Sequence, residues 1–152
     1  MKINKLKIIN YKLFQNVTIE MNDNINIFVG ENDSGKTTIL EALTMVLTGK
    51  INGSNIANRL NLDWFNAKVR QEFKESIEIG ETPSLPSIEI ETYFVAPNDD
   101  EIAIKKFKGT NNSLHEDTEG VKLEIIFDPQ YAPAYKQLLF DGKVKDIPVE
   151  YY

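Results

Sequence analysis

Residues 30–37 read Gly-Glu-Asn-Asp-Ser-Gly-Lys-Thr, and this stretch decides the fold. It fits the pattern G-x-x-x-x-G-K-[ST], in which a glycine-rich turn joins a strand to a helix and cradles phosphate groups. Glycine lets backbone N–H groups approach phosphate oxygens without a Cβ in the way. The ammonium of Lys36 supplies a positive charge to the β- and γ-phosphates, and the Thr37 hydroxyl is a ligand for Mg²⁺. The stretch therefore predicts a phosphate-binding loop (P-loop) for a nucleoside triphosphate and its magnesium ion.

The sequence on either side of the P-loop predicts the strand and the helix that the motif requires. Residues 25–29 read Ile-Asn-Ile-Phe-Val, a short run that is typical of a strand. Residues 36–48 carry apolar side chains on one broad face and end before Gly49, which predicts a helix with a glycine cap. The positive end of this helix would point at the phosphates. A glycine-rich turn that binds nothing is the alternative, and this context disfavours it.

The composition describes one ordinary folded domain and excludes several kinds of site. The chain has 152 residues with 41% hydrophobic residues, enough to form its own core. The absence of cysteine excludes disulfides and thiolate metal sites. The single histidine, His115, lies in a polar stretch and is expected to be a solvated loop residue. The net charge of −6 argues against a nucleic-acid-binding surface over the whole chain.

The sequence predicts a cytoplasmic protein without a membrane partner. It contains no apolar stretch long enough to span a bilayer, and residues 1–5 lack the features of a secretory signal. Lysines cluster at residues 2–7 and 105–108. We expect these clusters to be solvated strand faces rather than contacts to DNA.

Hydrophobic periodicity predicts strands before the P-loop and an antiparallel meander after it. The short link between residues 17–22 and 25–29 predicts that these two strands pair antiparallel. Residues 57–75 read as an untidy helix in which Trp64 is a packing residue. Further strands are expected at residues 5–8, 87–95, 102–107, 121–127 and 147–152, with a short helix at residues 132–140.

We therefore expect one α/β (α+β) unit over residues 1–152, with a mixed sheet that includes the meander. Residues 1–49 hold the first strands, the P-loop and its helix, and residues 50–86 a helical insert and loop. Residues 87–152 hold the antiparallel meander and a C-terminal strand. The aromatic ending favours an incomplete fold, the front piece of a longer protein, over a terminal edge strand.

Residues that would complete a hydrolytic site are not evident in the sequence. A P-loop hydrolase needs a second carboxylate for Mg²⁺ and a group that positions water. The nearest match to an apolar strand ending in that carboxylate is residues 123–128, but Glu124 interrupts it and Pro129 follows it. We expect a surface strand ending in a turn there, and we assign no catalytic residue.

Two phrases of the sequence resemble the N-terminal lobe of ABC-type ATPase heads. They are residues 5–14, Lys-Leu-Lys-Ile-Ile-Asn-Tyr-Lys-Leu-Phe, and residues 30–43, which contain the P-loop. The chain is similar to the group that holds the RecF, SMC and Rad50 proteins, and most similar to the OLD-family (overcoming lysogenization defect) ATP-dependent endonucleases. The match covers the first third of the chain, and the later strands resemble the β subdomain of OLD-like proteins only loosely.

The resemblance implies an ATP-binding lobe that is completed by a C-terminal part absent from this sequence and by dimerisation of two heads. The parent would be an ATPase that powers or regulates a DNA repair, recombination or phage-defence nuclease. DNA would be contacted only through the parent, and this lobe alone would not hydrolyse ATP. A self-contained, non-hydrolytic nucleotide-binding regulator is the alternative. A small P-loop kinase is less favoured, because it needs an arginine-rich lid and the chain has only Arg59 and Arg70.

The resemblance also implies which residues bind ATP and Mg²⁺. Lys36 would bind the β- and γ-phosphates, Thr37 the Mg²⁺ ion, and Thr38 the α-phosphate. Lys12 would reach the phosphates from the preceding turn, with a weaker grip than the arginine that is common there. Asp33, where asparagine or glycine is usual, would add negative charge. The full expected set of nucleotide ligands is Gly30, Asn32, Asp33, Ser34, Gly35, Lys36, Thr37, Thr38 and Lys12.

Two further positions are assigned by the resemblance with alternatives left open. Tyr11 or Phe14 would line the adenine side of the site, although core packing is the stronger expectation for either. No convincing Q-loop glutamine of the ABC-type heads can be placed in this sequence, and Gln130 is only a candidate.

Overall fold

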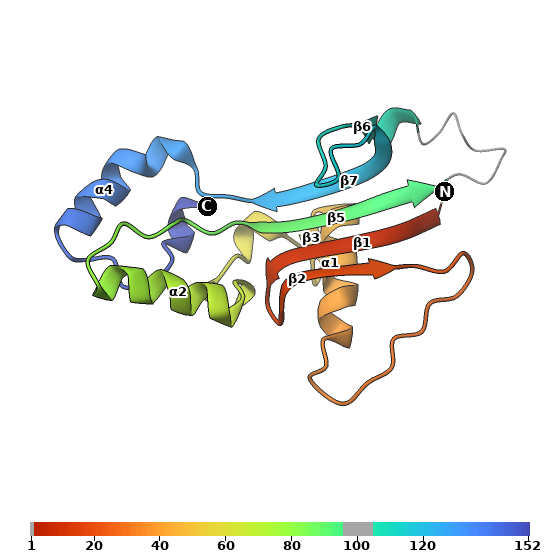
Figure 1. Cartoon of the computed structure of the whole chain (residues 1–152), viewed down its shortest axis with the longest axis horizontal. Helices are drawn as coiled ribbons and strands as arrows, with labels where there is room; N and C mark the ends of the chain where they lie inside the picture. The colour runs from red at the N-terminus through yellow and green to blue at the C-terminus, as the bar shows by residue number, and fades with distance from the viewer. Residues whose placement is uncertain (1, 96–104) are drawn as a thin grey trace.

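The computed structural model describes residues 2–95 and 105–152, and the structural statements below concern these residues. One antiparallel sheet has α1 (Lys36–Thr48) beside it, while α2 (Ala67–Glu78) and α4 (Ala132–Phe140) lie beyond one end of the sheet (Figure 1). This confirms the expected α/β (α+β) class with antiparallel strands, but the sheet is not the expected mixed one, because every described strand pair is antiparallel. The strand order is β2-β1-β5-β7-β6, formed by β2 (Phe14–Glu20), β1 (Lys2–Tyr11), β5 (Ile88–Val95), β7 (Thr118–Ile125) and β6 (Lys108–Gly109).

The sheet has one apolar face and one charged face, because side chains alternate along each strand. Leu6, Ile8 and Ile90 are fully buried in a core to which α1 contributes. On the other face, Glu91 of β5 lies directly opposite Lys7 of β1 and Lys122 of β7. The apolar face of the sheet therefore packs against α1. On the charged face, acidic and basic side chains of neighbouring strands form ion pairs with one another.

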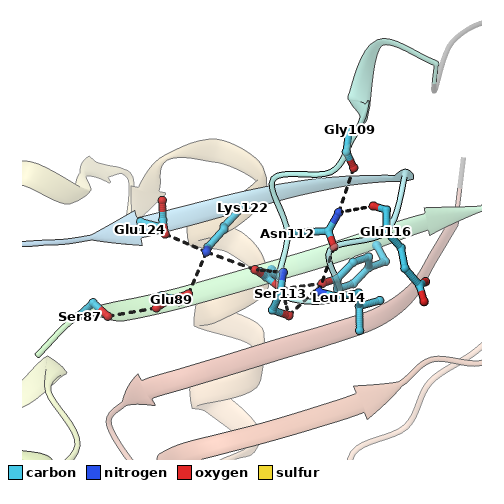
Figure 2. Close-up of polar contacts among 11 residues, drawn as sticks. Ser87, Glu89, Gly109, Asn112, Ser113, Leu114, Glu116, Lys122 and Glu124 are labelled. Carbon is cyan, nitrogen blue, oxygen red and sulfur yellow. Dashed lines mark hydrogen bonds and ion pairs between the residues drawn. The ribbon is translucent and has the colours of Figure 1, made fainter.

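A closed polar network occupies the charged face of β5 and β7. Glu91 is only 2% exposed, and its carboxylate accepts hydrogen bonds from the hydroxyl and the N–H of Ser113, at 2.6 and 3.0 Å. Lys122 lies between Glu89 and Glu124, with nitrogen–oxygen distances of 2.9 and 2.8 Å (Figure 2). The network attaches the loop that contains Ser113 to the sheet.

Residues 25–29 were expected to form the strand that leads into the P-loop, and this prediction is wrong for the described structure. They belong to the long irregular connection between β2 and α1 (Figure 1). Ile25, Ile27 and Val29 are 74%, 78% and 85% exposed. A strand needs a neighbour to pair with its N–H and C=O groups, and the described residues place none beside this segment.

The expected helix over residues 57–75 is divided. Two 3₁₀ turns, Ile56–Asn58 and Leu62–Trp64, precede α2. Asn66 caps α2, because its side chain accepts a hydrogen bond of 3.1 Å from the N–H two residues later. The cap starts a new helix where the sequence pattern suggests a continuous one. Trp64 is buried, as expected for a packing residue.

Two of the expected later strands also differ. Residues 102–104 lie outside the described residues, and Lys105–Phe107 forms a 3₁₀ turn. The expected strand at 147–152 is a 3₁₀ turn, Val149–Tyr151, because Pro148 fixes its φ and cannot donate to a strand ladder. The expected strands at 5–8, 17–22, 87–95 and 121–127 and the helices at 36–48 and 132–140 are confirmed, some with shifted ends.

The short segment after α1 was expected to be a loop. In the structure it contains a small hairpin of β3 (Lys50–Ile51) and β4 (Ser54–Asn55). Among the described helices, none combines the length and the apolar character needed to cross a membrane.

Candidate nucleotide-binding site

The N-terminus of α1 is open to a ligand. Its cap residue, Gly35, has a φ of 93°, and none of the side chains that the structure describes caps the helix. A Cβ at Gly35 would lie 2.6 Å from the Phe14 ring, so the position requires glycine for both its conformation and its space. The first N–H groups of a helix have no acceptor within it, and they combine with the helix dipole to attract anions. The local geometry is therefore that of an anion site.

A cleft of about 640 Å³ lies at this helix start. Thr37 is exposed on it, whereas Thr38 is buried at its wall. Leu13, which is 58% exposed, also borders the cleft and was missed by the sequence reasoning, because nothing in the pattern marks a leucine in a turn as part of a site. The lining residues are Leu13, Asn32, Asp33, Gly35, Lys36, Thr37 and Thr38.

The ammonium of Lys36 lies across the P-loop. Its Nζ donates to the carbonyl oxygens of Gly30 and Glu31, at 2.8 and 2.5 Å, and lies 3.3 Å from Oγ of Ser34. Gly30 and Ser34 therefore contact Lys36 and are not part of the cleft lining. A phosphate oxygen that entered the cleft would compete with two neutral carbonyls, and hydrogen bonds to a charged acceptor are the stronger kind.

Lys12 does not line the cleft but contacts α1. Its Nζ lies 2.5 Å from Oε2 of Glu41, and both side chains are half-buried. The hydroxyl of Tyr11 donates to the same oxygen over 3.3 Å. Burial first, and then the charge of Glu41, raise the pKa of Tyr11 far above its ordinary value, so the hydroxyl stays protonated. The binding of phosphate by Lys12 stays a prediction.

The two aromatic candidates for the adenine side have packing roles in the structure. Tyr11 is fully buried, and its ring meets Trp64 edge-on with centroids 6.1 Å apart. The Phe14 ring lies against Gly35. Neither residue borders the cleft.

The residues considered for hydrolysis lie in a turn away from the cleft. The carboxylate of Asp128 accepts the N–H of Gln130 at 2.9 Å and caps the 3₁₀ turn Pro129–Tyr131. The side chain of Gln130 donates back to this carboxylate. The described residues contain no group of three or more histidine, cysteine or acidic side chains that could hold a metal ion. For Mg²⁺, the cleft lining offers the hydroxyl of Thr37 and the carboxylate of Asp33.

Comparison with known proteins gives the family. The profile of the AAA ATPase domain family matches residues 1–146. The chain is 30% identical to the DNA replication and repair protein RecF of Clostridium kluyveri, over 100% of this chain and 41% of that protein. It is 25% identical to RecF of Clostridium beijerinckii, over 100% of this chain and 40% of that protein. RecF of Clostridium perfringens is 42% identical over 43 residues, which are 28% of this chain and 12% of that protein.

The chain thus spans about two fifths of the length of the first two relatives. These similarities support an ATPase lobe of the RecF/SMC kind. Because the family profile covers nearly the whole sequence, the chain belongs to the AAA ATPase domain family.

Proposed function

We propose that this chain is the ATP-binding lobe of an ATPase that acts in DNA repair or recombination. The observation that carries the proposal is the uncapped N-terminus of α1, which opens into a cleft of about 640 Å³ beside Lys36. The P-loop N–H groups would surround the triphosphate, and the ammonium of Lys36 would move from its two carbonyls to the β- and γ-phosphates. Thr37 would bind Mg²⁺, which supplies charge neutralisation of the phosphates when it is bound. Thr38 would approach the α-phosphate.

Large apolar side chains are exposed just before the P-loop and on α1. Ile25, Ile27 and Val29 precede the P-loop in the chain, and Leu40 and Leu47 of α1 are also exposed. Large exposed apolar patches mark surfaces that other polypeptide covers. We propose that the remainder of the ATPase pairs a strand with residues 25–29 and covers the leucines.

The remainder would also supply what the lobe lacks for turnover. It would contribute the hydrolytic carboxylate, dimerisation of two heads and contact with DNA. This lobe alone would bind ATP without hydrolysing it. An OLD-like nuclease, including one in phage defence, is the finer form of the proposal, and a cytoplasmic location is part of it.

The test is calorimetric titration of the chain with ATP·Mg²⁺. The wild type should bind ATP more tightly than AMP, and Lys36→Ala should weaken ATP binding at least about tenfold, because a charge-assisted hydrogen bond to phosphate is lost. Lys50→Ala, which removes an exposed lysine outside the cleft, is the matched control and should leave binding unchanged. Equal binding by Lys36→Ala and the wild type would refute the proposal.

A self-contained nucleotide-binding regulator is the second candidate, and the closed core of the five-stranded sheet favours it. Both candidates bind ATP, so calorimetry does not separate them. The reading frame beyond Tyr152 does: a continuation into further domains favours the ATPase lobe, and a stop codon favours the regulator.

A further inference from the structure

The backbone of Lys12 is fixed although its side chain is long and flexible. Lys12 has a φ of 48°, and its N–H donates to the carbonyl of Trp64 at 2.8 Å. The side chain of Asn66 donates to the carbonyl of Lys12 at 2.7 Å. The lysine side chain has a flexible four-carbon stem, so the ammonium can move while the backbone of the turn stays in place. In the structure this ammonium is paired with Glu41.

Glu41 lies close to the expected triphosphate site. It follows Thr37 by four residues in α1, so the two side chains share one face of the helix and the two residues are separated by about 6 Å along the axis. The turn that carries Lys12 also borders the site, because Leu13 lines the cleft and Phe14 meets Gly35. Lys12 and Glu41 do not line the cleft themselves, but each is close in the chain to residues that do, Leu13 and Thr37. We therefore infer that the ion pair lies near the rim of the cleft, within the reach of a lysine side chain.

The Lys12–Glu41 pair is sensitive to an incoming anion. A triphosphate in the cleft would place several negative charges about one helical turn from the Glu41 carboxylate, which would repel that carboxylate and attract the ammonium. Glu41 would still keep the Tyr11 hydroxyl as a hydrogen-bond donor if the lysine left. The Glu41 carboxylate would therefore not be left without a hydrogen-bond donor.

We propose that Glu41 is a positioning residue that retains the Lys12 ammonium at the rim of the cleft and releases it to the phosphates when a triphosphate binds. This inference rests on the proposed function, and it adds a residue that the sequence reasoning did not select. Glu41 competes with the ligand for one cation, so it makes binding depend on the charge of the ligand. A triphosphate displaces the ammonium more readily than a diphosphate or a monophosphate.

The test compares the affinities of ATP·Mg²⁺, ADP·Mg²⁺ and inorganic tripolyphosphate for the wild type, Glu41→Gln and Lys12→Met. Glu41→Gln keeps the shape and an acceptor for Tyr11 but frees the ammonium, so ATP should bind about threefold more tightly, with a smaller gain for ADP. Lys12→Met should bind ATP at least about threefold more weakly. Both effects should shrink at high salt, where charges are screened.

Glu72→Gln is the control for net charge, because it removes a carboxylate from an exposed ion pair of α2 outside the cleft. It should leave affinity unchanged. A purely structural ion pair predicts that Glu41→Gln and Lys12→Met weaken binding alike and lower the melting temperature together. That result, or an unchanged affinity in Glu41→Gln, would overturn this inference alone. If the wild type did not bind ATP, both this inference and the proposed function would be overturned.

Discussion

The network around Glu91 and the P-loop cleft treat polar groups in opposite ways. Glu91 is buried, accepts hydrogen bonds from Tyr93 and Ser113 and forms an ion pair with Lys122, so its charge is compensated within the fold. At the start of α1, helix N–H groups are left without a capping side chain. In the Glu91 network, which we assign only to stability, the polar groups are paired within the protein. Where it leaves donors uncapped beside a cleft, we infer a ligand.

The same contrast holds for apolar side chains. Ile88 and Ile90 of β5 alternate along a strand that pairs with β1 on one side and β7 on the other, and both are fully buried. Ile25 and Ile27 repeat the alternation in a segment that pairs with no strand in the described part of the chain, and both are exposed. The alternation alone therefore does not decide whether a strand forms, because the neighbouring strand must also be present.

The largest expected effect is a difference in stability between variants of the buried strand β5 and of the exposed residues 25–29. Ile90→Ala should lower the free energy of unfolding by about 3–4 kcal/mol, because it leaves a cavity in the core. Ile27→Ala makes the same chemical change at an exposed position and should alter stability by less than about 0.5 kcal/mol. Urea denaturation of both variants measures the difference. Equal losses would show that residues 25–29 are packed in solution, and would contradict the open description of this region.

A somewhat smaller effect is expected within the polar network. Glu91→Ala should lower stability by about 3 kcal/mol, because it leaves the hydroxyls of Tyr93 and Ser113 without their buried carboxylate acceptor. Glu124→Ala removes a carboxylate that contacts the same lysine at the solvent-exposed edge, and it should lower stability by less than about 1 kcal/mol. Thermal unfolding at neutral pH compares the pair. Similar losses for both would mean that burial does not distinguish the two carboxylates.

The smallest expected effect is the contribution of the Glu91 carboxyl to the loss of stability at acid pH. Burial alone raises the pKa of Glu91, but hydrogen bonds from Ser113 and Tyr93 and the charge of Lys122 outweigh it and hold the pKa below its ordinary value. A carboxyl with a lowered pKa in the folded state stabilises the fold above the unfolded-state pKa, which is about 4.3. That stability is lost as the pH falls through the folded-state pKa.

Glu91→Gln removes this titration and should flatten the loss of stability below about pH 4. Urea midpoints of the variant and the wild type between neutral and acid pH provide the measurement. A loss of stability in acid that is as steep in the variant as in the wild type would show that other carboxylates cause it.

Much of the fold was predictable from local pattern. The helix at residues 36–48 has a glycine before it and Gly49 after it, and its bounds were predicted without error. The strand expected at residues 25–29 was wrong because pairing depends on distant parts of a polypeptide, which a local pattern does not contain. The helix expected at residues 57–75 was divided by asparagine caps, which compete with helix propensity.

The site was predictable to the extent that its motif is contiguous. Six of the expected ligands line one cleft because the P-loop brings its own residues together. Leu13 and Glu41 were missed, since their positions depend on how the β1–β2 turn packs on α1. A signal existed for Glu41, which shares a polar helix face with Thr37, but only the structure shows that Lys12 is its partner.

The most direct test of the central claim is titration of the ¹⁵N-labelled chain with ATP·Mg²⁺ and, separately, with inorganic tripolyphosphate. The account predicts that both ligands shift the amide resonances of residues 35–38 more than any others, because these N–H groups start α1 and are expected to bind phosphate. Unchanged resonances at residues 35–38, or shifts that gather around Glu91 and Ser113 instead, would contradict it.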